Sequence, residues 1–390
     1  METEIKYIDN LCVRITDGSH FSPEDDEKGL YPMYSVKDME YNSFSNQNCK
    51  HIGQEVFEKL AKADCRPLKD DIVIAKDGSY LKYVFKVKDD MDACILSSIA
   101  ILRPNKKVIN PDYFVYLMRS ASVKNAMANY VSGSALPRII LSDFKKMKIA
   151  ICANLNKQKQ IASILSAYDS QIENNQKRIK LLEQMAENLY KEWFVRFRFP
   201  GYENAEFEGG VPKGWRMEKM ENIAKISAGG DAPKDMSDTY SKDYPFPVFS
   251  NGIKDDGLYG YCKKATIPGD SITISARGTV GYVTYREEPF LPIVRLISLH
   301  SFSDGLFPVW LFFYLKNDSI DGYGTSQQQI TIPFIEKKKV IVPPKNLQVL
   351  FNDQVTFFFS ERRLLKKQND LLTHQRDLLL PRLMSGKLSI

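Results

Sequence analysis

The sequence predicts an α+β protein in which two mixed α/β domains are separated by two long helices that pair as an antiparallel coiled coil. Three observations predict it: a long internal repeat, a heptad pattern of apolar residues at the end of each half, and short apolar runs broken by turn residues within each half. Antiparallel pairing of the two helices would turn a head-to-tail repeat into an object with pseudo-two-fold symmetry.

The repeat has a period far longer than that of a solenoid. Ile139–Ile151 returns 191 residues later as Ile330–Val342, with apolar and lysine positions in register. Upstream, Asp70–Gly78 matches Asp270–Gly278 at an offset of 200. Because the offset falls between these anchors, we expect the first half to carry a few extra residues, around Ala121–Asn129.

The predicted order is therefore domain, helix, domain, helix. We name the two globular parts the first arm and the second arm. The predicted boundaries are residues 1–153 for the first arm, 154–200 for the first long helix, 201–344 for the second arm, and 345–390 for the second long helix and tail.

Each arm is predicted to contain short strands joined by tight turns and followed by one helix. Apolar runs that end at Asp-Gly or Arg-Gly are typical of hairpins, and a proline in the first turn favours a helix start. The pairing of the strands stays open. The expected strands are Asp71–Lys76, Tyr83–Val87 and Cys94–Leu102, then Ser271–Ser275, Gly281–Tyr285 and Ile293–His300; the expected helices include Tyr113–Met118 and Trp310–Leu315.

The first long helix is predicted from Asn156 to about Phe199, roughly 65 Å at 1.5 Å per residue. Two heptad columns predict the coiled-coil seam. Asn175 interrupts one of them, either as a buried residue that fixes the register or as a solvated position. The columns are Ile161, Tyr168, Asn175, Leu182 and Leu189, and Leu165, Ile172, Ile179, Ala186 and Trp193.

The second long helix is predicted from Leu347 to about Leu383, with a stop at Leu380-Pro381 because proline breaks a helix. Two adjacent apolar columns favour packing against more than one neighbour. We expect one column to pair with the first helix: Phe358, Leu365, Leu372 and Leu379, each preceded by a second apolar residue.

Composition agrees with a folded protein that has a polyanionic partner, without establishing one. Hydrophobic residues make up 43% of the chain, which suffices for real cores, and the net charge is +6. The six cysteines contain no CxxC pair and suit reduced thiols. There is no signal pattern at the N-terminus and no apolar run of membrane-spanning length, so we expect a soluble, cytoplasmic protein.

The chain resembles the specificity (S) subunit of Type I restriction–modification systems. Besides the order of arms and helices, three segments carry the resemblance: Gly269–Gly281, the Pro343-Pro344 step into the second helix, and the ending Leu379–Leu388. The first helix begins after Cys152-Ala153 and lacks such a Pro-Pro step.

The resemblance implies a DNA-binding, non-catalytic specificity subunit. Each arm would act as a target-recognition domain that reads one half of a bipartite site in double-stranded DNA, and the helices would set the gap. The helices would also dock two methyltransferase subunits that bear AdoMet and methylate DNA, and restriction/translocase subunits would use ATP and Mg²⁺. No cofactor and no metal is expected in this chain.

Candidate DNA contacts are polar groups near the predicted turns, because such groups reach base edges in a groove. A salt bridge for Arg277, a solvated loop for the glutamines, and a surface turn for Ser19 and His20 remain the structural alternatives. The candidates are Ser19, His20, Lys76, Ser79, Lys82 and Arg138 in the first arm, and Arg277, Thr279, Gln327, Gln328 and Gln329 in the second.

Catalytic motifs are missing from the sequence. It contains neither the Asp-Pro-Pro-Tyr type of amino-methyltransferase run nor a phosphate loop, and the four histidines are scattered, so no zinc helix of the HExxH type exists. Three alternatives stay open: an enzyme with a divergent site, a coiled-coil scaffold that binds no DNA, and the specificity chain of a related Type IIB-like system.

Overall fold

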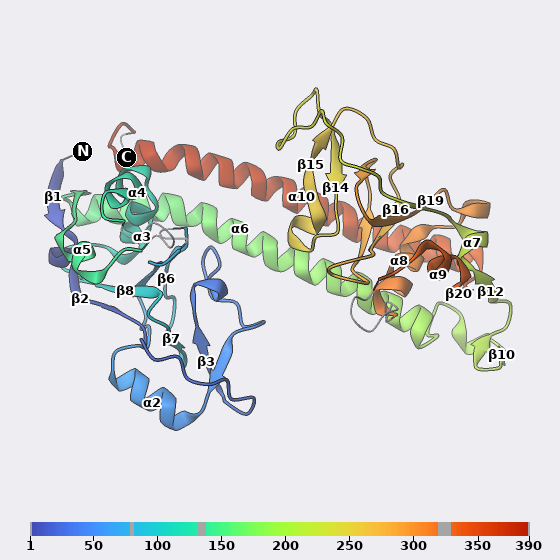
Figure 1. Ribbon diagram of the computed structural model, residues 1–390, viewed down its shortest axis with the longest axis horizontal. Coiled ribbons are helices and arrows are strands. Elements are labelled where there is room, and N and C mark those ends of the chain that lie inside the picture. Colours follow the sequence, from blue (N-terminus) through green and yellow to red (C-terminus); the bar gives the residue numbers. More distant parts are fainter. Residues whose placement is uncertain (1, 79–81, 132–137, 319–328, 389–390) are drawn as a thin grey trace. The chain divides into compact units, whose positions relative to one another are not determined.

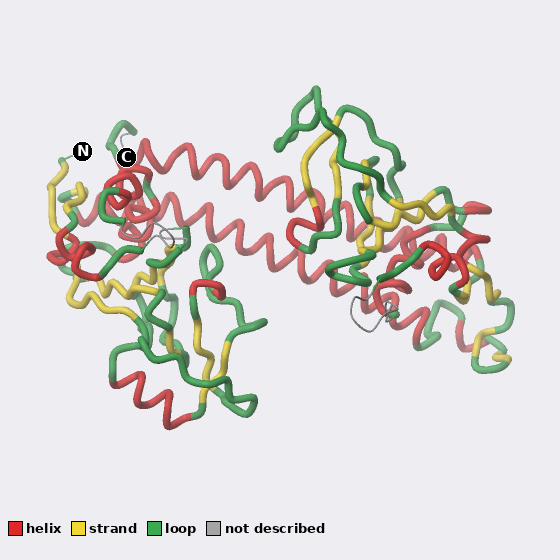
Figure 2. The backbone as a smooth tube through the Cα atoms, in the orientation of Figure 1, coloured by secondary structure: helices red, strands yellow, loops and turns green. Residues whose placement is uncertain are grey.

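The computed structural model describes residues 2–78, 82–131, 138–318 and 329–388 (Figures 1 and 2). It divides into two compact units, Met1–Asn175 with Lys367–Ile390, and Gln176–Lys366. Each unit therefore combines one arm with one end of each long helix. The division runs through the helices because each helix end packs on its own arm.

Three small sheets form the first arm. Their strand orders are β2-β8-β5-β6, β4-β3-β7 and β1-β9. The strands are β1 Thr3–Tyr7, β2 Cys12–Asp17, β3 Tyr31–Tyr34, β4 Lys50–Ile52, β5 Ile72–Ala75, β6 Val84–Lys86, β7 Cys94–Ile95, β8 Ile99–Pro104 and β9 Lys148–Cys152; the helices are α1 Ile8–Leu11, η1 Val36–Asp38, α2 Gln54–Lys62, α3 Pro111–Arg119, α4 Ala121–Ala128 and α5 Leu141–Lys146.

The second arm repeats these sheets, as β13-β19-β16-β17, β15-β14-β18 and β12-β20, and adds the ribbon β10-β11. Its strands are β10 Phe207–Glu208, β11 Val211–Pro212, β12 Arg216–Lys219, β13 Lys225–Ala228, β14 Phe246–Phe249, β15 Leu258–Cys262, β16 Ser271–Ser275, β17 Val283–Arg286, β18 Leu291–Pro292, β19 Leu296–His300 and β20 Lys339–Val342; its helices are η3 Tyr202–Asn204, α7 Met220–Ile223, η4 Lys254–Gly257, η5 Ser303–Gly305, α8 Pro308–Asn317 and α9 Ile332–Lys337.

The sequence repeat is thus a repeat of strand order and register. Ile72 pairs with Leu102 in the first arm, as Ile272 pairs with Leu299 in the second. The segment Ala121–Ala128, near which the extra residues are expected, forms helix α4. The repeat and the α+β class are confirmed.

Local chemistry explains where these elements begin. The four residues of β5 are all buried, as suits the inner strand of a sheet covered on both faces. Helix α3 starts at Asn110, whose side chain accepts from the Tyr113 N–H at 2.9 Å, with Pro111 in the first turn. Helix α8 likewise has Pro308 at its start.

The first long helix, α6, spans Leu155–Tyr190 and passes into a π turn, η2, over Lys191–Val195. The predicted end at Phe199 is therefore wrong. The chain leaves the helix near Phe197, which has a left-handed φ of 56°. Trp193 and Phe194 then pack on Phe351, with Phe194 and Phe351 ring centroids 4.8 Å apart, so this aromatic cluster belongs to a core.

The second long helix, α10, spans Lys345–Met384 and continues past Pro381, where a stop was predicted. That prediction is wrong because the proline removes one backbone donor close to the end, where one more turn is held by packing. Leu383 in this turn is 1% exposed and belongs to the core of the first arm. The Ser385 N–H donates to the Pro381 carbonyl at 3.1 Å, which completes the turn.

Within the first unit the two helices run antiparallel. Asn175 is fully buried; its Nδ2 donates to Gln368 Oε1 and to Asn369 Oδ1, both at 2.9 Å, and its Oδ1 accepts from Gln171. The solvated alternative for Asn175 is therefore excluded. Asp169, which precedes Asn175 by six residues on α6, accepts from the Arg376 guanidinium of α10 at 2.6 Å.

Asp169 also joins this helix pair to the first arm. Its Oδ2 accepts from the Tyr116 hydroxyl of α3 at 2.7 Å. Burial raises the pKa of Tyr116 first, and the neighbouring carboxylate raises it further, so this hydroxyl remains a donor. The buried carboxylate is thus paired on both sides, as a charge inside a protein must be.

Within the second unit, the same two helices meet through larger apolar groups. Ala186, Tyr190 and Trp193 of the first helix share a core with Phe351 and Val355 of the second. All residues of the predicted seam columns are buried or half-buried: Ile161, Leu165, Tyr168, Ile172, Asn175, Ile179, Leu182, Ala186 and Leu189 on α6, Trp193 on η2, and Phe358, Leu365, Leu372 and Leu379 on α10.

A buried glutamine joins each arm to its helix in the same way. Gln158 Oε1 accepts from the Asn110 N–H at 2.8 Å, and its Nε2 donates to the Cys152 carbonyl at 2.8 Å. Gln348 repeats both bonds, accepting from the Phe307 N–H at 3.2 Å and donating to the Pro343 carbonyl at 2.8 Å. Each glutamine therefore ties the start of the arm's helix and the end of its last strand to the long helix.

Two further expectations concern the chain as a whole. The six cysteines are free thiols, five of them buried. Among the residues that the structure describes, no helix combines the length and the apolar character that crossing a membrane requires.

We expect Gln158→Ala to lower the free energy of unfolding by about 2–4 kcal/mol, because it leaves a buried N–H and a buried carbonyl without their partner. Chemical denaturation of the full chain measures this loss. Gln160→Ala removes an exposed glutamine two residues away and serves as the matched control. Equal stability of the two variants would contradict the role of Gln158 in joining the first arm to its helix.

Candidate nucleic-acid interface

Two segments that were singled out separately in the sequence meet in each arm. The first is the turn after β5 or β16, and the second is the chain that leads into α5 or α9. The Ile139 N–H donates to the Lys76 carbonyl at 3.0 Å, and the Ile330 N–H donates to the Ala276 carbonyl at 3.1 Å. One equivalent backbone bond therefore joins the two segments in both arms.

The first glycine after each of these strands borders open space. Gly78 and Gly278 have φ values of 64° and 74°, which glycine adopts without strain, and a Cβ added to either would touch nothing within 4 Å. Gly281 has a φ of 82°, so both of these second-arm glycines adopt the left-handed conformation of a turn. The space beside them is available to a ligand.

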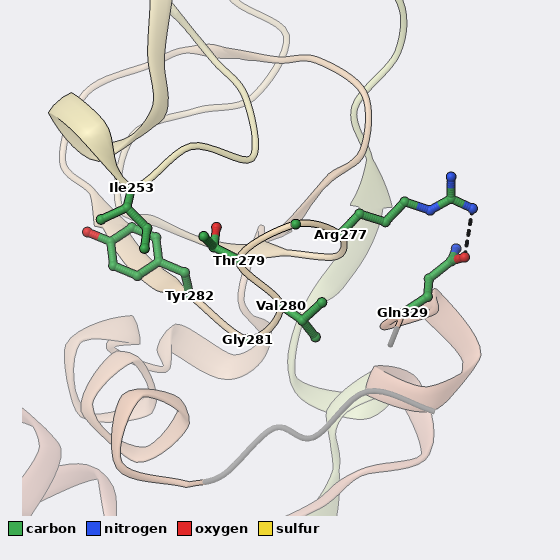
Figure 3. A pocket seen from close by; sticks show the side chains of 8 residues that line it. Ile253, Arg277, Thr279, Val280, Gly281, Tyr282 and Gln329 are labelled. Carbon is green, nitrogen blue, oxygen red and sulfur yellow. Dashed lines mark hydrogen bonds between the residues drawn. The ribbon is translucent and has the colours of Figure 1, made fainter. Parts of the chain in front are cut away.

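In the second arm the turn borders a depression of about 1070 Å³ (Figure 3). Arg277 and Gln329 extend side by side at its rim, and Arg277 Nη2 donates to Gln329 Oε1 at 2.7 Å. The Thr279 hydroxyl donates to the Asn251 carbonyl at 3.2 Å and so holds the turn. The described lining residues are Ile253, Arg277, Gly278, Thr279, Val280, Gly281, Tyr282 and Gln329.

Polar contacts behind the turn hold this region in place. The Tyr282 hydroxyl donates to Asp256 at 2.8 Å, and burial followed by this carboxylate raises the pKa of Tyr282. Arg286 is buried with its guanidinium 3.6 Å from the centroid of the Phe249 ring and donates to the Asp256 carbonyl. Burial lowers the pKa of Arg286 to about 10, so it stays charged at neutral pH and acts from inside the arm.

The first arm has an ion pair at the matching place. Arg138 Nε lies 3.1 Å from Asp77 Oδ1, with side chains 43% and 21% exposed. Asp77 was absent from the predicted contacts. The repeat could have identified it, because Asp77 occupies the position of Arg277 and Arg138 occupies that of Gln329.

Lys76, predicted as a DNA contact, is buried instead. Its side chain is 2% exposed and its Nζ lies 3.2 Å from Asp17 Oδ2. In this structure the amine cannot reach a groove, so the prediction is corrected to a structural ion pair. The matched positions in the second arm are Ala228 and Ala276, which shows that the sheet does not need this pair.

The remaining candidates of the first arm differ in access. The Ser19 hydroxyl is buried; it donates to the Phe21 carbonyl at 2.6 Å and accepts from the Phe21 N–H at 3.1 Å. The prediction that Ser19 contacts DNA is therefore corrected to a structural role in its turn. His20 is 71% exposed beside Asp17. Lys82 is exposed and lies over the Tyr83 ring. Ser79, Gln327 and Gln328 lie outside the described residues.

Comparisons with known proteins agree on one family. Residues 4–184 and 212–374 match the family described as Type I restriction modification DNA specificity domain. The chain is 27% identical over 304 residues to the Type I restriction enzyme MjaIX specificity subunit of Methanocaldococcus jannaschii, covering 72% of this chain and 69% of that protein. It is 24% identical over 389 residues to the Type I restriction enzyme HindI specificity subunit of Haemophilus influenzae, covering 79% and 84%.

A solved structure shares the fold. The S subunit of a Type I restriction–modification system from M. genitalium superposes with a TM-score of 0.61 at 19% identity, covering 98% of this chain and 96% of that one.

We expect Lys76→Ala to destabilise the first arm by roughly 3–5 kcal/mol, because it removes the buried amine that faces the nearly buried Asp17 carboxylate. The double variant Asp17→Ala/Lys76→Ala should lose less, since the second arm tolerates alanine at both places. Thermal and urea denaturation of the full chain test both statements, with the exposed Lys82→Ala as control. A Lys76→Ala protein of unchanged stability that binds DNA more weakly would restore Lys76 as a contact.

Proposed function

This chain belongs to the family of Type I restriction–modification DNA specificity proteins, and we propose that each arm binds one half of a bipartite DNA target. The observation that carries the proposal is the repeated pair of segments at β5 and β16, where each arm presents an arginine beside an open turn. Two copies of one DNA-contacting arrangement in a single chain suit a target made of two separated halves.

Tethering explains why two arms would be used together. A second contact made by a tethered arm is intramolecular, so it adds affinity only when the spacing of the half-sites matches the tether. We propose that α6 and α10 form this tether and set the gap. A stiff helical tether would make spacing part of the specificity.

We further propose that the chemistry belongs to partner subunits. Methyl transfer from AdoMet to adenine N6 would be carried out by two methyltransferase subunits, and ATP- and Mg²⁺-dependent translocation and cleavage by restriction subunits. The residues of this chain would bind and orient DNA and hold the partners. Its expected place is the cytoplasm, where both DNA and these partners reside.

An exposed apolar column on α10 supports partner docking. The residues that precede the seam column are 47–61% exposed and recur every seven residues. A heptad-spaced apolar column is the surface onto which another helix packs. We propose that helices of the methyltransferase subunits cover it. The column comprises Leu350, Phe357 and Leu364 in the second unit, and Leu371 and Leu378 in the first.

Methylome sequencing tests the proposed function. A host expressing this chain with its methyltransferase partner should acquire N6-methyladenine in a split motif, on both strands, and the motif should vanish when this chain is left out. An intact complex that protects no DNA sequence would leave the coiled-coil scaffold as the better explanation.

Insertion of one heptad into α6, matched by one in α10, should change the length of the unread gap while both half-sites keep their bases. The physical reason is that the helices are the tether between the arms. The same methylome measurement reads the new gap. A gap of unchanged length would rule out the helices as the spacer.

We expect Phe357→Lys/Leu364→Lys to abolish association with the methyltransferase, because two charges would be buried in an apolar contact. The chain should remain folded, since both side chains are exposed. Co-purification and the mass of the complex provide the measurement. Thr356→Lys adds a charge at an exposed neighbour of Phe357 and serves as the control; equal loss in both variants would contradict the docking surface.

A further inference from the structure

The two arms hold a guanidinium at the same place but supply it from opposite segments. In the first arm the arginine is Arg138, in the segment before α5, and it faces Asp77 in the turn. In the second arm the arginine is Arg277, in the turn, and it faces Gln329 in the segment before α9. The cation and the oxygen that faces it have exchanged positions.

The backbone shows that the positions are equivalent. Ala75 pairs with Ile99 as Ser275 pairs with Leu296, so the residues that follow the two strands match one another. The backbone bonds of Ile139 and Ile330 then set residue 138 beside residue 77, and residue 329 beside residue 277. The exchange therefore concerns side chains on one unchanged framework.

A second ion pair in the same region shows what a purely structural pair does. Asp17 and Lys76 are nearly inaccessible, and the second arm replaces both by alanine. A pair that only supports the fold is dispensable here. By contrast, the guanidinium is present in both arms, and it reaches solvent in both: Arg138 is 43% exposed in its side chain, and Arg277 is exposed.

Guanidinium geometry suits base reading in this arrangement. Arginine has five N–H donors, and two on one edge can bond the O6 and N7 of guanine. The bond from Arg277 to Gln329 uses one donor of Nη2, which leaves a complete two-donor edge. In the first arm Asp77 Oδ1 lies 3.1 Å from Nε, the guanidinium nitrogen nearest the chain.

We propose that each arm reads one guanine through its arginine, Arg138 in the first half-site and Arg277 in the second. Asp77 and Gln329 are positioning residues that aim the guanidinium through their oxygen atoms. Because a freely rotating arginine loses entropy when it binds, holding it in advance favours the contact. This inference rests on the proposed function and names the base that each arm requires.

Methylome sequencing of the complete complex with single arginine variants tests the proposal. Arg138→Lys should relax a guanine at one position of one half-site, and Arg277→Lys should do so in the other half-site. Discrimination against the other bases at that position should fall about 5- to 150-fold. Arg14→Lys and Arg216→Lys change exposed arginines of the same arms elsewhere and should leave the motif unchanged.

A transplant separates reading from support. Arg138→Gln should lose the guanine requirement, and Asp77→Arg/Arg138→Gln, which builds the second arm's pair in the first arm, should regain it. A supporting ion pair would change the amount of folded complex but not the base chosen at one position. If the transplant reads no guanine while its complex still methylates DNA, the proposal is overturned.

Base analogues decide the question on the wild-type complex, whatever the variants do. Replacing each guanine of the target in turn by 7-deazaguanine removes N7. In each half-site, the replacement of one guanine should strongly reduce binding and methylation of the target. A half-site without a guanine, or one in which every replacement is tolerated, overturns the proposal for that arm. A wild-type complex that yields no split motif would instead defeat the proposed function itself.

Discussion

The structure depends on two buried glutamines that join arms to helices. Gln158 and Gln348 each satisfy one N–H at the start of a short helix and one carbonyl at the end of the last strand. These backbone groups would otherwise be buried without partners, which costs far more than a single hydrogen bond contributes. Trp310 adds a third bond to Gln348 by donating from its indole Nε1. Each arm is consequently fastened to its helix through its backbone.

This fastening leaves the side chains of the arms free to differ. The first arm buries Asp17 and Lys76 where the second has two alanines, and the guanidinium beside the open turn comes from a different segment in each arm. Strand order is the same despite these changes, and the register of β5 with β8 matches that of β16 with β19. A framework held by backbone bonds and apolar packing can accept different side chains without being rebuilt, which suits the proposed reading of two half-sites.

The helix seam combines two kinds of contact. In the first unit it is partly polar, with Asn175 and the Asp169–Arg376 ion pair fully partnered, and a buried polar contact of this kind specifies one register. In the second unit aromatic side chains fill the seam. The exposed apolar column of α10 contributes to neither seam, which agrees with the partner docking proposed for it.

The sequence by itself determined the repeat, the α+β class, both long helices and the seam columns. These features are periodic along the chain, and a period can be recognised from the order of residues alone. It also pointed to Arg138, Arg277 and Gln329. Only the tertiary structure decided that Lys76 and Ser19 are buried, that Asp77 faces Arg138, and that α10 continues through Pro381. Burial and partners depend on segments distant in the chain, and the packing of Leu383 on the first arm outweighs the local preference of a proline to end a helix.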